Sequence, residues 1–182
     1  MTSNSLPPFS RFRFAREGSI LANGKLPQGW SNENADDVSV DAIDLGPDGP
    51  SITVTLTFEA ANAAPFISIV LADYMPVPPD EVVALRMDVE TVRQSGVSGA
   101  FLILREWIAG GTYVGQATRP IPLDRGTVPI AAARMAGGES RLLQPLLSVR
   151  RAEGSAGSLS VRLRRVALAG VHDHPAWLTD AR

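Results

Sequence analysis

The residues that could catalyse a reaction are few, and their positions do not form a recognisable catalytic group. The chain has no cysteine, which excludes a thiolate nucleophile, and its only histidines are His172 and His174. A Ser–His nucleophile would have to reach into this C-terminal segment. The histidines and Asp173 could hold a metal from one side of an extended segment, but a structural site needs further ligands, and none stands out in the sequence. We interpret the segment as a solvated tail.

Paired carboxylates are the other group that could do chemistry, because hydrolysis of a glycosidic bond needs an acid and a base or nucleophile at a fixed separation. Asp88 and Glu90 alternate along one segment, as expected for the polar face of a strand at a solvated edge. We therefore predict a protein without catalytic activity. The candidate carboxylates are Asp73, Asp80, Glu81, Asp88, Glu90 and Glu106.

Aromatic residues beside a turn indicate binding instead. Rings hold sugars by stacking on their apolar C–H faces, and charged or amide side chains add hydrogen bonds. Trp107 and Tyr113 bracket the pair Gly110-Gly111, with Arg105 just before them, and Tyr74 lies in an upstream loop. We predict Arg105, Trp107, Tyr113 and Tyr74 as the ligand-binding residues.

The face on which Trp107 lies decides this prediction. Alternation along a strand places Arg105 and Trp107 on one face and Glu106 on the other. An outward Trp107 would form a sugar-binding platform with Arg105, whereas an inward Trp107 would anchor the core and leave Arg105 to end the strand. The residue types favour the core by a small margin. Trp30, which follows a glycine, is predicted to fill the core.

Alternation of apolar and polar residues predicts strands along most of the chain. In the segment 159–163, Ser160, Arg162 and Arg164 face water as a charged row that discourages edge pairing. Arg164-Arg165 then breaks the phase, which indicates a β-bulge. The clearest segments are Ser51–Phe58, with Ile52, Val54, Leu56 and Phe58 inward; residues 83–90, with Leu85, Met87 and Val89 inward; and residues 159–163.

Weaker strand signals fill the gaps, and the 16 glycines and 14 prolines mark the turns between them. About nine or ten short strands at this spacing predict an all-β protein, and a jelly-roll β-sandwich of two antiparallel sheets is the first choice. We divide the chain into an extended arm (residues 1–18), one jelly-roll domain (19–170) and a tail (171–182). The weaker strands are predicted at residues 20–22, 38–45, 66–72, 100–107, 112–116, 128–133 and 143–149.

Several turns and anchors together resemble a known family. They are the run from Leu21-Ala22-Asn23-Gly24 to Gly29-Trp30, the segment Leu104-Arg105-Glu106-Trp107 with Gly110-Gly111-Thr112-Tyr113, and the closing strands around 147–149, 159–163 and 166–168. Over residues 19–170 this pattern resembles carbohydrate-binding-like jelly-roll modules, which occur in glycan-active proteins and in phage or gene-transfer-particle tail, spike and fibre proteins.

The resemblance implies a non-catalytic module of a particle appendage that contacts bacterial surface polysaccharide. The alternatives are a structural adaptor or decoration domain that binds other particle proteins, and an accessory glycan-binding domain of a polysaccharide-processing system. Members that carry calcium usually have an acidic residue in the final strand, where this chain has Arg164-Arg165. We therefore expect no cofactor; Glu17, Asp41 and Asp173 would be the oxygen ligands of a structural Ca²⁺.

The net charge and the hydropathy of the chain limit the kinds of partner that it could bind. A net charge of −2 removes the general electrostatic case for nucleic acid, and no apolar run reaches the length of a membrane span. Residues 1–14 lack the apolar centre of a secretory signal, so we expect synthesis in the cytoplasm and incorporation in a virion-like particle. The family implies a homo-oligomer. Low aromatic content, 6% of the chain, favours the adaptor alternative.

Overall fold

The computed structural model describes residues 30–44, 51–71, 74–77, 79–108, 110–124, 126–135, 137 and 141–170. Residues 41–44, 75 and 166–170 are described by their backbone alone. The predicted strand at 20–22, the arm at 1–18 and the tail at 171–182 lie outside these residues, so the proposed domain boundaries stay predictions.

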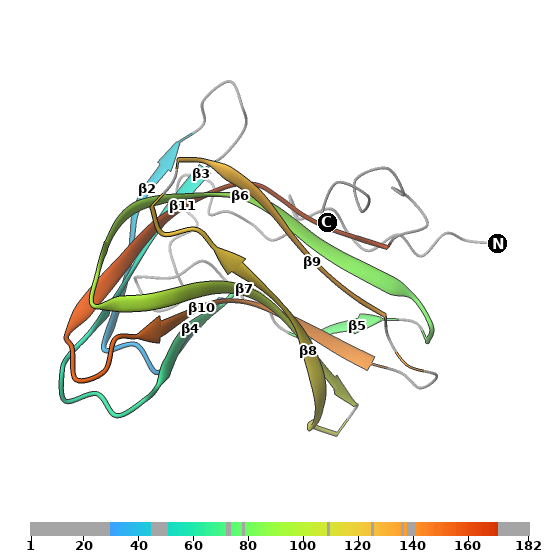
Figure 1. Ribbon diagram of the computed structural model, residues 1–182. Helices are drawn as coiled ribbons and strands as arrows, with labels where there is room; N and C mark the ends of the chain where they lie inside the picture. The colour runs from blue at the N-terminus through green and yellow to red at the C-terminus, as the bar shows by residue number, and fades with distance from the viewer. Residues whose placement is uncertain are drawn as a thin grey trace.

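The described residues form a sandwich of two antiparallel sheets, shown one above the other in Figure 1. They contain eleven strands, slightly more than predicted, and no helix, so the predicted all-β class is confirmed. No segment among them qualifies as a membrane-spanning helix. Sheet A contains β1 (Ser31–Glu33), β4 (Phe66–Val70), β5 (Met75–Val77), β7 (Val97–Ile108), β8 (Thr112–Ile121) and β10 (Arg141–Arg151); sheet B contains β2 (Asp37–Asp44), β3 (Ser51–Phe58), β6 (Val82–Ser95), β9 (Val128–Met135) and β11 (Gly157–Gly170).

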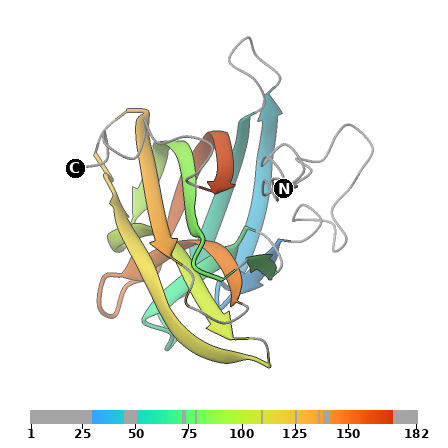
Figure 2. The same ribbon diagram turned by 90° about the vertical axis from the view of Figure 1, so that its right-hand side faces the viewer.

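The strand order brings distant parts of the chain together. Sheet A runs β1-β4-β10-β7-β8, with β5 also paired to β10, and sheet B runs β2-β3-β11-β6-β9. The chain changes sheet between β6 and β7 through Gly96 alone, which has a φ of 62°. Such a φ favours glycine, because a Cβ would strain the backbone there. The long β7–β8 hairpin closes at Gly110-Gly111, as predicted, and Figure 2 shows the sandwich from the side on which this hairpin lies.

The predicted strands that fall within the described residues are confirmed, although several are longer than the alternation indicated. The strand predicted at 112–116 extends to Ile121, and the one predicted at 143–149 is the middle of β10, which runs from Arg141 to Arg151. The sequence analysis missed β1 and β5, which have three residues each. Both are shorter than the four residues over which period-two alternation can be recognised.

The core lies between the sheets and follows the predicted alternation. Trp30 is part of it, as predicted. The other predicted inward residues of β3, β6 and β11 are buried, since apolar side chains at every second position meet those of the opposite sheet. These residues are Ile52, Val54, Leu56, Phe58, Leu85, Met87, Val89, Leu159, Val161 and Leu163.

The polar faces of β6 and β11 correct two predictions. Neither strand is an edge of sheet B: β11 is central, and β6 lies between β11 and β9. The row that includes Arg162 therefore cannot protect an edge, and Asp88, predicted at a solvated edge, is only 2% exposed. Ser160 is buried and hydrogen-bonded to Thr55 Oγ1 at 3.0 Å. Alternation identifies the face of a residue but not the place of its strand in the sheet.

The predicted β-bulge in β11 is confirmed. The pairing of β11 with β6 shifts register after Arg164, and Arg165 has a φ of 47°. The bulge directs Arg165 toward Asp88 of β6, with which it forms an ion pair. Beside this pair, Glu90 accepts a hydrogen bond of 3.0 Å from Arg162. The outer face of sheet B therefore carries cross-strand pairs of opposite charge.

Candidate functional site

Three aromatic side chains meet on the outer face of sheet A. The rings of Tyr74 and Trp107 are perpendicular, with centroids 5.9 Å apart, and Tyr113 meets Trp107 at 70° with a centroid distance of 5.4 Å. Trp107 lies between the two tyrosines, which are 50% and 49% exposed. We call Tyr74, Trp107 and Tyr113 the aromatic row.

The pairing of β10 explains how Tyr74 reaches the aromatic row. The first residues of β10 are paired on both sides: Leu142 lies opposite Trp107 of β7, and Leu143 lies opposite Met75 of β5. Tyr74 immediately precedes β5, so the short strand brings it next to Trp107. A three-residue strand that sequence patterning misses therefore positions one of the predicted site residues.

A bulge in β8 explains the position of Tyr113. Gly115 pairs with the inward-facing Glu106, so regular alternation would place Val114 opposite Trp107 and turn Tyr113 inward. The register shifts by one residue at this point, and Tyr113 instead lies opposite Trp107. An extra residue in one strand of an antiparallel pair redirects the neighbouring side chains in this way.

The orientation of Trp107 corrects the favoured interpretation. Leu102 and Leu104 on the same strand belong to the core, so Arg105 and Trp107, at odd positions, face away from it. Trp107 is therefore not a core anchor. Its Nε1 is buried and has no hydrogen-bond partner, which is unusual for an indole nitrogen.

A row of polar side chains runs beside the aromatic row. Gln144 of β10, Arg105 of β7 and Gln116 of β8 are in register across the sheet, two residues along from Trp107 on β7. Gln144 is buried and Gln116 is exposed, with its Nε2 donating to Thr118 Oγ1 at 3.1 Å. We call Gln144, Arg105 and Gln116 the polar row.

Arg105 is paired with a carboxylate from the far edge of the sheet. Its Nη1 and Nη2 donate to the two carboxylate oxygens of Glu33 at 2.9 and 2.8 Å. Glu33 lies on β1, and β4 and β10 intervene between β1 and β7, so the two side chains extend across both strands. Both are partly exposed, 20% for Arg105 and 37% for Glu33.

The structure thus brings together all four predicted ligand-binding residues and adds others that the sequence analysis missed. Gln144 had a usable signal, because it is the polar residue within the apolar run Leu142-Leu143-Gln144-Pro145-Leu146-Leu147. A glutamine there indicates an outer face. Gln116 and Glu33 had no such signal in the sequence, because their roles depend on which strands are neighbours in the sheet.

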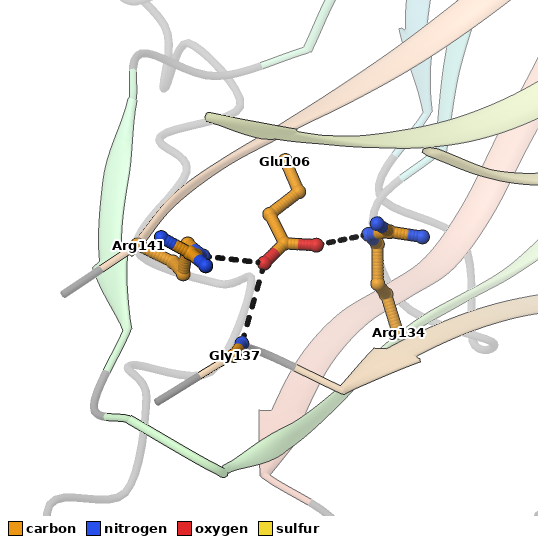
Figure 3. Close-up of polar contacts among 4 residues, drawn as sticks. All are labelled: Glu106, Arg134, Gly137 and Arg141. Carbon is orange, nitrogen blue, oxygen red and sulfur yellow. Dashed lines mark hydrogen bonds and ion pairs between the residues drawn. The ribbon is translucent and has the colours of Figure 1, made fainter. Parts of the chain in front are cut away.

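Glu106 lies on the opposite face from Trp107, as predicted, and takes part in a buried ionic cluster (Figure 3). Its carboxylate, 2% exposed, accepts a 2.9 Å hydrogen bond from Arg141 Nε and a longer one from the Gly137 N–H, and it pairs with Arg134 of β9. A Cβ at Gly115 would lie 2.6 Å from Arg134 Nη2, so glycine leaves room for the guanidinium. The cluster links the two sheets.

These contacts argue against a glycosidase built from three of the predicted carboxylates, Glu106, Asp88 and Glu90. Glu106 and Asp88 are buried and ion-paired with arginines, while Glu90 is shared by Arg162 and Arg164. General acid–base catalysis needs a carboxyl group within reach of the substrate. Within the described residues these three groups are ion-paired, and none of them faces the aromatic row.

The metal-binding predictions fall mostly outside the described residues. His172, His174, Asp173 and Glu17 lie there, and Asp41 is described by its backbone alone. Among the side chains that the structure does describe, no group of three or more histidine, aspartate or glutamate residues could hold a metal ion. The predicted absence of a cofactor, and the calcium alternative, remain untested predictions.

Comparison with known proteins supports the fold. No family model and no curated protein matches the sequence. Similar solved structures include the enzymatically active domain of bacteriophage CBA120 tailspike protein 4 (TM-score 0.53, 12% identity, 84% of this chain and 21% of that chain) and an arabinose-bound α-L-arabinofuranosidase (TM-score 0.55, 11% identity, 91% of this chain and 25% of that chain). The chain thus spans about a quarter or less of their length.

Carbohydrate-binding modules of β-sandwich type are also among the structural neighbours. One is the CBM22-1 xylan-binding domain from Paenibacillus barcinonensis (TM-score 0.46, 21% identity, 81% of this chain and 88% of that chain). The similarities to the tailspike domain and the arabinofuranosidase, at 12% and 11% identity, show a shared fold alone, and unrelated functions occur on one fold.

Proposed function

We propose that this chain is a non-catalytic carbohydrate-binding module whose site is the outer face of sheet A. The observation that carries the proposal is the aromatic row lying beside the polar row on one sheet face. Sugar rings have apolar C–H faces and polar hydroxyl edges, so they need both kinds of contact at neighbouring positions. Tyr74 and Tyr113 offer half-exposed rings, and Arg105 and Gln116 offer hydrogen-bond donors.

The location of these residues suits recognition of an extended chain. Most of them lie on paired strands of the sheet, which hold side chains more firmly than loops do. From Trp107 to Phe101 the outer face of β7 extends about 20 Å, at roughly 3.3 Å per residue. A polysaccharide could lie along this face with one sugar on the aromatic row and its neighbours further along the sheet.

We further propose that the polysaccharide belongs to a bacterial surface and that the module is part of a phage-like or gene-transfer-particle appendage. The resemblance of the sequence to modules of such particles supports this, as does the similarity in fold to part of a phage tailspike. Weak binding by one site would suit the role, because several copies on one particle gain avidity. A symmetric homo-oligomer would supply those copies.

A structural adaptor that binds other particle proteins is the second candidate. Four large apolar side chains outside the aromatic and polar rows are exposed among the described residues: Phe66, Val92, Val114 and Met135. Protein interfaces use such side chains. An accessory domain of a polysaccharide-processing system would use the same sugar-binding face, and the genes beside this one would distinguish it from a particle component.

The test is equilibrium binding of the purified chain to envelope polysaccharides, both free and coupled to a multivalent support. We expect saturable binding that Trp107→Ala weakens about tenfold or more, because the variant removes the central ring of the row. Val92→Ala is the matched control, since it removes an exposed apolar side chain from sheet B. Absence of binding in both formats would reject the proposal and leave the adaptor.

A further inference from the structure

The guanidinium of Arg105 already holds a carboxylate in the geometry that recognises acidic groups. Its two terminal nitrogens donate separately to the two oxygens of Glu33, at 2.9 and 2.8 Å. This paired arrangement matches a planar carboxylate of any origin, which is why arginine is the usual residue for such recognition. The structure therefore contains an acid-binding position that one of its own side chains occupies.

That position lies next to the aromatic row. Arg105 and Trp107 are two residues apart on the same face of β7, a separation of about 7 Å along the strand. A sugar stacked on the aromatic row would place its substituents, or those of the next sugar, within reach of this guanidinium. Gln144 lies beside Arg105 in register and could bind a neighbouring hydroxyl group.

Glu33 is poorly anchored compared with Arg105. It belongs to a three-residue strand at the edge of sheet A, whereas β7 is paired along most of its length on both sides. The pair is partly exposed, so solvent and salt screen the attraction between its two charges. A carboxylate from a ligand could therefore replace Glu33 at small cost.

The charge on this face favours an acidic ligand. The outward positions of the paired strands in the described part of sheet A carry Arg105, Arg150 and one carboxylate, Glu33. Arg150 lies over the ring of Phe101, 5.7 Å from its centroid, at the opposite end of the face from Trp107. Displacement of Glu33 would leave two arginines along the path of the proposed polysaccharide.

We infer that the site takes an acidic glycan, one that carries uronic acid or another carboxylated sugar, and that its carboxylate replaces Glu33 at Arg105. Glu33 is then an internal competitor that occupies the arginine when no ligand is bound. This inference rests on the proposed function, because it assumes that the outer face of sheet A binds sugars.

The test compares the wild-type chain with Glu33→Gln and Arg105→Lys on paired probes: oligogalacturonate and its fully methyl-esterified form, alginate, hyaluronan, and neutral xylan and dextran. We expect Glu33→Gln to raise affinity for the bound acidic glycans roughly threefold to tenfold, since it removes the competitor but keeps the side chain's size. Affinity for neutral glycans should stay the same. Arg105→Lys keeps the charge but loses the paired geometry, so it should weaken acidic binding.

The outcomes separate the inference from the proposed function. Binding of neutral glycans that depends on Trp107, with no binding of the acidic probes, would overturn the inference and leave the function. Acidic binding that Glu33→Gln fails to strengthen would also overturn it. If neither the probes nor the envelope polysaccharides bind, the inference and the proposed function are both rejected. Thermal unfolding of each variant checks that the fold is intact.

Discussion

The ring of Tyr113 meets the indole of Trp107, with centroids 5.4 Å apart, because β8 carries one extra residue at that point. Glycine at the hairpin turn and the bulge after Tyr113 together direct the tyrosine outward. The contact thus depends on a local irregularity of the strand, and Tyr74 completes the row from a separate strand.

The Tyr113 ring is expected to contribute directly to binding. Tyr113→Ala should lower glycan affinity about fivefold to tenfold, and Tyr113→Phe should retain most of it, because stacking uses the ring and not the hydroxyl. Val114→Ala, in the same hairpin and also exposed, is the control for a general effect on the turn. An equal loss in Val114→Ala would show that the ring is not the contact. Calorimetric titration measures all three.

The Glu106 cluster is expected to stabilise the fold. Glu106→Gln should lower the free energy of unfolding by about 2–4 kcal/mol, because it leaves Arg134 and Arg141 without their buried partner. Glu90→Gln is the control: Glu90 also pairs with arginine but is more exposed, so its loss should cost about 1 kcal/mol or less. Urea unfolding measures both, and similar effects would contradict the role of burial.

The crossing between the sheets should tolerate no side chain at Gly157. A Cβ there would lie 2.1 Å from the Ser95 carbonyl oxygen and 2.8 Å from Phe58 Cζ. Gly157→Ala should therefore lower the free energy of unfolding by about 1–3 kcal/mol. Gly126→Ala, where a Cβ meets nothing within 4 Å, should be close to neutral. Thermal unfolding measures both variants. If Gly157→Ala is as stable as the wild-type chain, β11 does not pack against Ser95 and Phe58 as closely as the structure shows.

Asp36 should make stability depend on pH in the acidic range. Its carboxylate accepts hydrogen bonds from the Glu59 N–H and Asn62 Nδ2, which together with the charge of Arg151 hold the pKa of Asp36 below its usual range. A lowered folded pKa stabilises the fold above the unfolded value, near 4, and this contribution disappears as pH falls through the folded pKa. Asp36→Asn should reduce the slope of stability against pH in that window. An unchanged slope in acid unfolding curves would contradict this.

The sequence predicted the fold class and most strands because their apolar residues alternate over five or more positions. It also identified Arg105, Trp107, Tyr113 and Tyr74, since aromatic residues beside a turn stand out. It could not decide the face of Trp107, because both faces of sheet A carry apolar residues: Ile103 and Leu146 form a second cluster on the outer face.

The wrong predictions about the exposure of charged side chains have a different cause. Asp88 and Arg162 alternate correctly with the core residues, but whether they face water depends on which strands flank them. Glu33 and Arg105 are 72 residues apart in the chain, and Asp88 and Arg165 are 77 apart. Pairs this distant follow from sheet order, which spacing along the sequence does not contain.

The most direct test of the sugar-binding face is an NMR titration that follows the indole N–H signals of the tryptophans as glycan is added. Trp107 can be assigned through Trp107→Phe, and Trp30, buried in the core, provides an internal reference. The account predicts that the Trp107 indole signal shifts in proportion to ligand bound while that of Trp30 stays in place. Saturable binding that leaves the Trp107 signal unmoved and shifts residues of β6 and β11 instead would contradict it.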